Sequence, residues 1–421
     1  MMWGDRKLSR DLLWTLGSFV FMGLSGLALN FAIGRFYGPE TLGAFSQVFA
    51  LYLVLSQFAV VGVWLSALKH VSEHAHDRVV RSVVLASALR LAIGLATVAT
   101  IVAGLLAGPI GTVTGSPAVE QGWTILLPGF WAYSVNKVWM AALNGVRDMR
   151  AYALAQMGRY AMMLVCLAIA VKGGLDGVYL PLVLGVPELC LFPIFALYCR
   201  RYFDAVAASA WVRWVRIHWD FGVRGFLSGA LAELNNRVDI IVLGMFSTDA
   251  RIGIYAMAAM IAEGLAQFAA VLRDNLNPLL AQAASRGDRD ELRRLARRSI
   301  ISFYAFMGVL LTVAAIVYPH IVALATGGNA FEASWVIFSI LALGIALGAG
   351  YLPLNMILVQ SGFPGRGTLF RLVLLVTTVG LNLALVPLWD ILGAAVAMGL
   401  SFIAAALYLR YFVFRYVGIR V

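Results

Sequence analysis

Ionisable and amide side chains are concentrated in the segment AELNNRVDIIVLG, residues 232–244. Glu233 and Arg237 are four residues apart, so they can pair along one face of a helix. Asn235 and Asp239 have the same spacing and fall on a neighbouring face. The surrounding sequence is apolar enough to lie in a bilayer, where charged groups are costly and normally face a cavity or a partner. We therefore expect this segment to lie in a membrane span that lines a water-filled cavity.

Cationic side chains in the apolar stretches suggest a binding site for an anionic group. The candidates for substrate binding are Arg237, Lys137, Arg90, Asn136 and Asn236. Guanidinium groups match phosphate oxygens bidentately. Inside or at the edges of the spans, the cations (Arg90, Lys137, Arg159, Arg224, Arg237, Arg273, Arg371) outnumber the acids (Glu188, Glu233, Asp239, Glu263, Asp274). This surplus of positive charge favours an anionic headgroup as substrate.

Several of these residues have a second interpretation. Glu233, Asp239 and Glu263 are candidate ion-coupling residues, because a partly buried carboxylate can bind a proton or a sodium ion; alternatively, they only balance local charge. Five arginines lie close to the predicted cytoplasmic helix ends and can snorkel to lipid phosphates instead of lining a cavity. These are Arg90, Arg159, Arg224, Arg273 and Arg371.

The elements that position these side chains are membrane spans. Hydrophobic residues make up 62% of the 421 residues and charged residues only 13%, unlike a soluble domain. Apolar stretches of about 20 residues, the length of a bilayer-crossing helix, recur along the whole chain. We predict an all-α polytopic membrane protein with about twelve transmembrane helices. The spans are expected near 12–34, 42–68, 82–107, 123–143, 153–171, 178–199, 221–246, 252–272, 299–318, 334–360, 368–387 and 392–411.

The sequence also repeats itself at an offset of 210 residues. Gly34 corresponds to Gly244, Gly43 to Gly253, Phe45 to Tyr255, and Gln57-Phe58 to Gln267-Phe268. A duplication of hydrophobic hairpins is typical of secondary transporters. Six spans per half give both halves the same orientation, so we predict a parallel repeat of two six-helix lobes. The predicted parts are an N-terminal lobe at 1–200, a cytoplasmic interfacial linker at 201–219 and a C-terminal lobe at 220–421.

The linker contains Trp211, Trp214 and Trp219 on one helical face, with Arg213 and Arg216 elsewhere. Such a helix can lie in the inner-leaflet interface, with its indoles at headgroup level. The alternative is a plain linker with a few buried aromatic residues.

The net charge of +11 is explained by topology. If both termini are cytoplasmic, 22 of the 32 Lys and Arg residues fall in inside segments, and the outside loops hold only Arg35, Lys172 and Arg251. This is the positive-inside bias of a multi-pass protein of the inner (plasma) membrane, and it requires no nucleic-acid partner.

Other chemistries find little support. His70 and His74 have metal-ligand spacing on a helix, but no second ligand cluster accompanies them, so no metal site is expected. No phosphate-binding glycine loop with lysine occurs, and the extramembrane segments, at most about 20 residues, are too short for a catalytic domain. We expect a transporter that is not an enzyme, has no cofactor and is driven by a proton or sodium gradient.

With these features in hand, the chain resembles the polysaccharide and O-antigen flippases of the multidrug, oligosaccharidyl-lipid and polysaccharide exporter superfamily. The resemblance rests on GRFYGPETLGAFSQVFAL in the first half and RVDIIVLGMFSTDARIGIYAMAAMIAE in the second, followed by NPLLAQAASRGDRDELRRLARRS, QSGFPGRG and LNLALVPLWDILGAAVAMGLS. It covers nearly the whole chain. Only Arg237 and Asp239, in RVDIIVLG, are carried over from it as site residues.

This resemblance implies a bundle of two six-helix lobes that alternates between inward- and outward-open states. It further implies that a polyprenyl-diphosphate-linked oligosaccharide crosses from the cytoplasmic to the periplasmic leaflet among membrane lipids. A polysaccharide polymerase and a chain-length regulator are possible partners. Two other classes stay open: a multidrug and toxin extrusion-type drug exporter, which would favour an acidic, aromatic cavity, and a non-transporting scaffold or polymerase.

Overall fold

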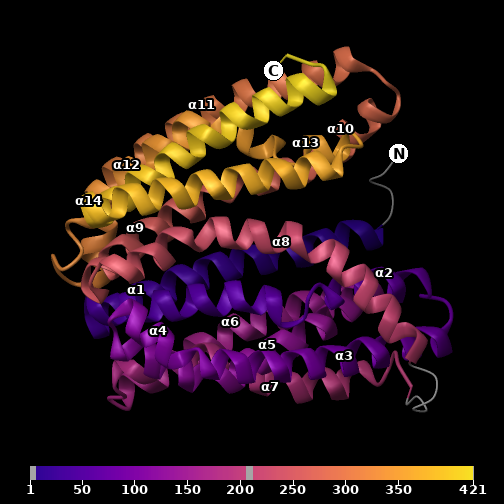
Figure 1. Ribbon diagram of the computed structural model, residues 1–421, viewed down its shortest axis with the longest axis horizontal. Helices are drawn as coiled ribbons and strands as arrows, with labels where there is room; N and C mark the ends of the chain where they lie inside the picture. The colour runs from indigo at the N-terminus through magenta and orange to yellow at the C-terminus, as the bar shows by residue number, and fades with distance from the viewer. Residues whose placement is uncertain (1–5, 205–211, 421) are drawn as a thin grey trace. The chain divides into compact units, whose positions relative to one another are not determined.

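The computed structural model describes residues 6–204 and 212–420, and over these residues the chain is helical with no β-strand (Figure 1). The first half contains α1 (Arg6–Ala59), α2 (Val63–Glu73), α3 (Arg78–Leu105), α4 (Ala107–Thr114), α5 (Pro117–Gly145), α6 (Met149–Lys172) and α7 (Leu182–Cys199). The second contains α8 (Val212–Phe246), α9 (Asp249–Ala266), α10 (Phe268–Ser285), α11 (Arg289–Thr326), α12 (Ser334–Gly348), α13 (Ile357–Gln360) and α14 (Pro364–Phe412). Short 3₁₀ helices occupy Gly177–Tyr179 and Ala349–Leu354, and a π-helical turn occupies Val413–Val417.

The helices account for the twelve predicted spans. Among the described residues, eight stretches are long and apolar enough to cross a membrane. Two of them hold two spans each, because the backbone leaves helical geometry at Gly38 in α1 and at Asp390 in α14. The more polar α5 and α8, with 29 and 35 residues, are also long enough to cross, which brings the total to twelve. The all-α, twelve-span prediction is confirmed.

Contacts divide the chain into two units, which are described separately. Unit 1 consists of Met1–Asn30 and Gln47–Ala230, and unit 2 of Phe31–Ser46 and Leu231–Val421. Both α1 and α8 therefore contribute residues to both units. Residues 205–211 of the predicted linker, with Trp211, lie outside the described residues, whereas residues 212–219 form the first turns of α8.

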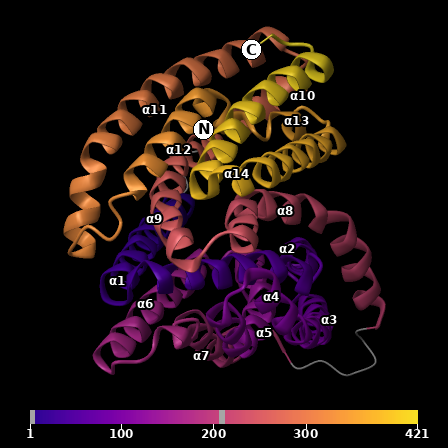
Figure 2. The ribbon, with the colours of Figure 1, turned by 60° about the vertical axis from the view of Figure 1, so that its left-hand side comes forward.

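The same packing solution occurs inside each unit. In unit 1, α5 and α7 lie side by side (Figure 2), and a Cβ on Gly129 would collide with the backbone of Gly185. In unit 2, α12 and α14 are paired in the same way, and a Cβ on Gly344 would collide with Gly399. Small residues at such crossings let helix backbones approach closely, which is how membrane helices gain packing energy without a hydrophobic driving force.

Two tryptophans mark the duplication as well. The Trp123 indole N–H of α5 donates to the carbonyl oxygen of Ala103 on α3 at 2.9 Å. The Trp335 indole N–H of α12 donates to the carbonyl oxygen of Ala315 on α11, also at 2.9 Å. The two units thus repeat both the glycine crossing and the tryptophan bond, as two copies of one six-helix plan.

The repeated glycines of the sequence motif touch each other within unit 2. A Cβ on Gly43 would collide with the Asp249 carbonyl and lie 2.8 Å from the Gly253 nitrogen. A Cβ on Gly253 would collide with the Pro39 carbonyl and lie 3.0 Å from the Gly43 nitrogen. No side chain fits at either position, so glycine is required in both copies.

Two predicted spans are interrupted where the repeated Gln-Phe pair occurs. In the second span, α1 ends at Ala59 and α2 begins at Val63, because Val61 and Gly62 adopt positive φ angles of 41° and 69°. In the eighth span, α9 ends at Ala266 and α10 begins at Phe268. Hydrophobic length predicts that a span exists, but these breaks come from backbone conformations that hydrophobicity does not encode.

Candidate functional site: ionic clusters within each unit

Lys137 lies on α5 in the interior of unit 1. Its ammonium group donates to the carbonyl oxygen of Ser56 at 3.0 Å and to the Ser56 hydroxyl at 2.9 Å. It also lies 4.9 Å from the ring centre of Tyr133, one helical turn earlier on α5. This is a cation–π distance, so the electrostatic attraction of the ring stabilises the buried charge.

A buried ion pair lies next to Lys137. Arg159 of α6 and Glu188 of α7 approach to 2.5 Å between Nε and Oε1. Asn136 donates to the Glu188 carboxylate and to its backbone carbonyl oxygen, both at 2.9 Å. The Arg159 guanidinium carbon is 5.5 Å from the ring centre of Tyr133, so two cations share this one ring.

We call these residues, with Lys137, the unit 1 cluster. Its formal charge is +1, from the two cations Lys137 and Arg159 and the single acid Glu188. Glu188 and Asn136 have no exposed surface, and Arg159 is only 9% exposed. Arg159 therefore does not snorkel to the membrane surface.

The second group of charges, the unit 2 cluster, is centred on Arg237 of α8. Its Nε is 3.7 Å from Glu233, and its Nη1 is 3.3 Å from Glu263 of α9. The pairing of Glu233 with Arg237 predicted from their four-residue spacing is confirmed. One cation and two acids give this cluster a formal charge of −1.

The neighbouring polar residues of α8 bind to other helices. Asp239 is 1% exposed and accepts hydrogen bonds from the Tyr255 hydroxyl at 2.5 Å and the Ile240 backbone N–H at 2.9 Å. The Asn235 side-chain oxygen accepts from the Thr378 hydroxyl of α14 at 2.9 Å. Asn235 and Asp239 thus use partners on α9 and α14, which the helical spacing alone does not predict.

The remaining candidates lie on α3, α8, α10 and α14. Asn236 is exposed on α8, and Arg90 is exposed on α3. Arg224 is exposed and donates to the carbonyl oxygen of Asp220 in its own helix at 2.8 Å. Arg273 pairs with the adjacent Asp274 at 3.0 Å, and Arg371 donates to the Met356 sulfur at 3.3 Å.

Sequence reasoning did not single out Glu188, Tyr133 or Ser56 as members of a site. The available signal for Glu188 was a lone carboxylate in the apolar run of α7, which implies a buried cation partner. Its pairing with Arg159 joins residues 29 positions apart, so it depends on tertiary packing. Tyr133 carried no signal, because an aromatic residue in a membrane span is common.

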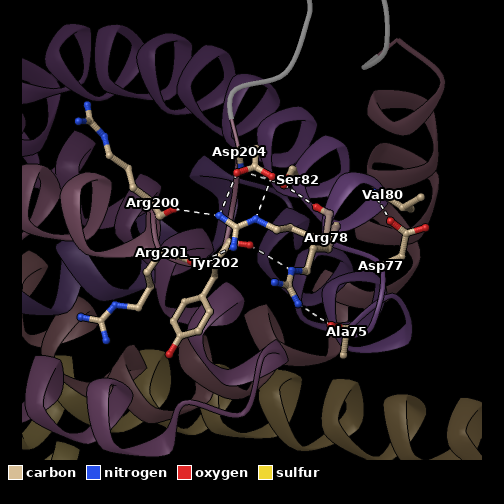
Figure 3. Close-up of polar contacts among 10 residues, drawn as sticks. Ala75, Asp77, Arg78, Val80, Ser82, Arg200, Arg201, Tyr202 and Asp204 are labelled. Carbon is tan, nitrogen blue, oxygen red and sulfur yellow. Dashed lines mark hydrogen bonds and ion pairs between the residues drawn. The ribbon is translucent and has the colours of Figure 1, made fainter.

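A third polar group lies in unit 1, at the N-terminus of α3 (Figure 3). The Arg78 guanidinium binds both carboxylate oxygens of Asp204 at 2.9 Å and donates to the carbonyl oxygen of Arg201 at 3.0 Å. The Ser82 hydroxyl accepts from the Asp204 backbone N–H at 2.9 Å. Hydrogen bonds from Arg78 lower the pKa of the Asp204 carboxyl, so it stays ionised at neutral pH. This group fixes the chain that follows α7 onto α3.

Known proteins share this architecture. A family model described as polysaccharide biosynthesis protein matches residues 8–284. No curated protein matches the chain. Among solved structures, an inward-facing multidrug resistance MATE family transporter of the MOP superfamily is similar, with a TM-score of 0.77, 15% identity, and 94% of this chain and 95% of that chain covered.

Two further solved structures share the fold. The lipid II flippase MurJ, in an inward closed conformation, gives a TM-score of 0.76 at 12% identity over 97% of this chain and 88% of that one. A MOP superfamily transporter from Pyrococcus furiosus, for which reverse polarity of the binding pocket suggests a different function, gives 0.52 at 15% identity over 97% and 94%.

Proposed function

The chain belongs to the polysaccharide biosynthesis protein family, and from this premise we propose that it is a flippase for a lipid-linked sugar. It moves a polyprenyl-diphosphate-linked oligosaccharide from the cytoplasmic to the periplasmic leaflet of the inner membrane. The two-lobe, twelve-span fold that it shares with the MATE transporter and MurJ supports a carrier. It carries out no bond chemistry of its own and requires no cofactor.

The observation that carries this proposal is the opposite formal charge of the two clusters. The unit 1 cluster has one cation more than its acids, and both cations lie near the Tyr133 ring, at 4.9 Å and 5.5 Å from its centre. An unpaired phosphate in hydrocarbon is strongly destabilised. In our proposal Lys137 offsets part of that desolvation while the polyprenyl tail stays among membrane lipids.

The unit 2 cluster is then the coupling site. Glu233 and Glu263 share the single cation Arg237, so the cluster retains one uncompensated acid that suits a proton or a sodium ion. Arg237, a sequence-based candidate for phosphate binding, instead holds these two carboxylates in place. The Asp239 carboxylate is already satisfied by Tyr255 and Ile240, so we assign it a structural role and leave coupling to the two glutamates.

A cation-coupled multidrug exporter is the second candidate, and the acid surplus of the unit 2 cluster is the observation that favours it. The two functions differ in the phenotype of a deletion strain. A flippase deletion loses surface polysaccharide and accumulates lipid-linked oligosaccharide on the cytoplasmic leaflet. An exporter deletion keeps the polysaccharide and becomes sensitive to cationic drugs.

The sharper test is complementation of that deletion strain with Lys137 variants. Lys137→Met removes the charge and keeps the length of the side chain, so we expect at least a roughly tenfold loss of surface polysaccharide, equivalent to about 1.4 kcal/mol. Lys137→Arg should retain most of it, and Lys172→Met, in a predicted outside loop, serves as the matched control. Equal polysaccharide from Lys137→Met and wild type, at equal protein in the membrane, would contradict the assignment.

The setting of the protein follows from the same proposal. Both termini lie in the cytoplasm, in agreement with the distribution of basic residues. Its partners are the polyprenyl-diphosphate-linked oligosaccharide, membrane lipid, and the polysaccharide polymerase and chain-length regulator that act on the translocated product. No nucleic acid is involved.

A further inference from the structure

The first residues of α3 in unit 1 correspond to those of α11 in unit 2. In each helix an aspartate is the N-cap residue, and its side chain accepts from the backbone N–H three positions later at 2.9 Å. The first helical residue after each cap is an arginine. The two pairs are Asp77 with Arg78 in α3 and Asp288 with Arg289 in α11. Both units therefore have a guanidinium at the same point of equivalent helices.

The segment after α7 corresponds in the same way to the segment at the end of α14. Residues 200–204 read RRYFD, and residues 414–418 read FRYVG. In each copy the guanidinium carbon of the arginine lies 5.8 Å from the ring centre of the tyrosine that follows it. The corresponding residues are Arg201 and Arg415, Tyr202 and Tyr416, and Asp204 and Gly418. We call each segment, together with the arginine that begins α3 or α11, the basic anchor of its unit.

In unit 1 the basic anchor is neutralised by two carboxylates of the chain. Asp204 accepts two hydrogen bonds from Arg78, each at 2.9 Å, which ties the segment after α7 to the start of α3. Asp148, the N-cap residue of α6, accepts from the hydroxyls of Tyr202 at 2.8 Å and Tyr198 at 2.9 Å. The unit 1 anchor therefore contains its own anions.

In unit 2 both of these acids are replaced by uncharged residues. The residue that corresponds to Asp204 is Gly418, and a Cβ built on it would lie 3.5 Å from the guanidinium carbon of Arg289. The Arg289 side chain thus reaches the place where a carboxylate would be attached. The N-cap residue of α14 is Phe363, whose ring centre is 6.5 Å from that of Tyr416. The cations of the anchor are retained in unit 2, and the two anions are not.

Unit 2 adds one more cation at the same place. The guanidinium carbon of Arg366 lies 4.6 Å from the ring centre of Tyr416, so the guanidinium groups of Arg366 and Arg415 are both within 6 Å of this ring. Arg289, Arg366 and Arg415 are all exposed. The ion pairs among the described residues of unit 2 belong to other arginines. The unit 2 anchor therefore has three accessible cations that are not neutralised by a described acid.

The neighbouring surface of α14 indicates where these cations lie. Leu407, Tyr411 and Phe414 follow one another at spacings of four and three residues, and they are 59%, 60% and 48% exposed. An exposed apolar face on a membrane span contacts acyl chains. Arg415 follows this face directly, and the Arg420 guanidinium lies 5.3 Å from the ring centre of Phe414. Basic and aromatic residues at the end of a span are typical of the level of the lipid headgroups.

We propose that Arg289, Arg366 and Arg415 bind the phosphate of an anionic phospholipid headgroup. Guanidinium groups match phosphate oxygens bidentately, as Arg78 matches the Asp204 carboxylate in unit 1. The phosphate takes the place of that carboxylate and ties the end of α14 to the start of α11. The acyl chains of the lipid lie along the exposed apolar face of α14. This site is separate from the ionic clusters and does not depend on which substrate the protein carries.

The first test compares two sets of arginines. The purified full chain in detergent is titrated with phosphatidylglycerol, and bound lipid is measured by native mass spectrometry. The site variant combines Arg289→Gln, Arg366→Gln and Arg415→Gln. The control variant removes the same charge from exposed residues of α11, by Arg293→Gln, Arg297→Gln and Arg298→Gln. We expect the site variant to bind the first lipid at least about tenfold more weakly and the control less than about twofold. Equal losses would reflect diffuse charge and would overturn the site.

The second test restores the missing carboxylate. Gly418→Asp and Gly418→Asn place side chains of the same size at a φ of 79°, a conformation that both residues tolerate, so only the charge differs. In wild type and in Gly418→Asn, phosphatidylglycerol should raise the midpoint of thermal unfolding by at least about 2 °C over phosphatidylcholine. In Gly418→Asp the rise should be about half of that or less, because the carboxylate already pairs with Arg289. An equal rise in both variants would contradict the proposal.

Two further ligands identify the source of the phosphate. Phosphatidylcholine should compete weakly with phosphatidylglycerol, because its choline group is itself a cation. Inorganic phosphate should also compete weakly, because it has no acyl chains to lie along α14. Full competition by inorganic phosphate would show that the site binds a free anion and would overturn the assignment to a lipid headgroup.

Discussion

Arg159 and Glu188 are neutralised by each other inside unit 1, with 2.5 Å between Nε and Oε1 and no exposed surface on Glu188. Their charges therefore cancel locally, and the formal excess of the cluster belongs to Lys137. Asn136 also binds to this pair, because its side-chain amide nitrogen donates to both the carboxylate and the backbone carbonyl oxygen of Glu188. Substitutions at individual residues therefore have distinct expected effects.

Glu188→Gln should destabilise the protein by about 3–5 kcal/mol, because it leaves a buried guanidinium without a counter-charge. The measurement is the thermal unfolding of the purified protein in detergent. Replacing both partners, Arg159→Met with Glu188→Met, should recover much of the loss. A single variant as stable as the wild type would show that the pair is not buried as described.

Gly43→Val and Gly253→Val should each prevent the packing of unit 2, with a loss of about 3 kcal/mol or more, because every added Cβ collides with backbone atoms. The readout is the yield of monodisperse protein extracted from membranes. Gly26→Val and Gly94→Val are the controls, since a Cβ at either position meets nothing within 4 Å. Loss in only one copy of the repeat would contradict the mutual contact.

Glu263→Gln should uncouple transport from the ion gradient, because it removes one of the two carboxylates that share Arg237. We expect at least about tenfold less surface polysaccharide at an unchanged membrane level. In reconstituted vesicles, the residual transport should no longer respond to an imposed gradient. Glu332→Gln, an exposed acid of the same unit, is the control, and a gradient response retained by Glu263→Gln would refute coupling at this site.

The hydrogen bonds of Asp148 should make the free energy of unfolding depend on pH. Partial burial opposes its ionisation, but hydrogen bonds from the Ala151 N–H and from the hydroxyls of Tyr202 and Tyr198 outweigh this effect and lower the pKa of the Asp148 carboxyl. The stability it confers is therefore complete above the unfolded pKa of about 4 and disappears as pH falls through the lower folded value.

Asp148→Ala should accordingly lower the free energy of unfolding by about 1 kcal/mol at pH 7, since it also removes the N-cap of α6. The difference from wild type should stay constant down to about pH 5 and shrink below about pH 4. Tyr198→Phe with Tyr202→Phe should reproduce part of the loss. Melting curves over this pH range provide the measurement, and a difference that grows toward acid would refute the sign.

Hydrophobicity predicted the helical class and the number of spans, and the four-residue helical spacing predicted the pairing of Glu233 with Arg237. Those features depend on helical spacing and on the length of apolar stretches, and both can be determined from residues that are neighbours in the sequence. The break at Val61 and Gly62 was missed because a positive φ in a non-glycine residue has no hydrophobic signature. The Arg159 and Asn136 partners of Glu188 and the Tyr255 partner of Asp239 were missed because these contacts join different helices, and the sequence alone does not specify which side chains meet.

The reciprocal contact of Gly43 and Gly253 reflects the internal repeat. Each copy of the repeated glycine lies against the backbone nitrogen of its own counterpart. In a twofold-symmetric homodimer, a residue on the axis meets itself in the partner subunit. The two copies of the repeated glycine therefore meet each other as a residue on such an axis meets itself, and a side chain added to either copy disturbs the same contact.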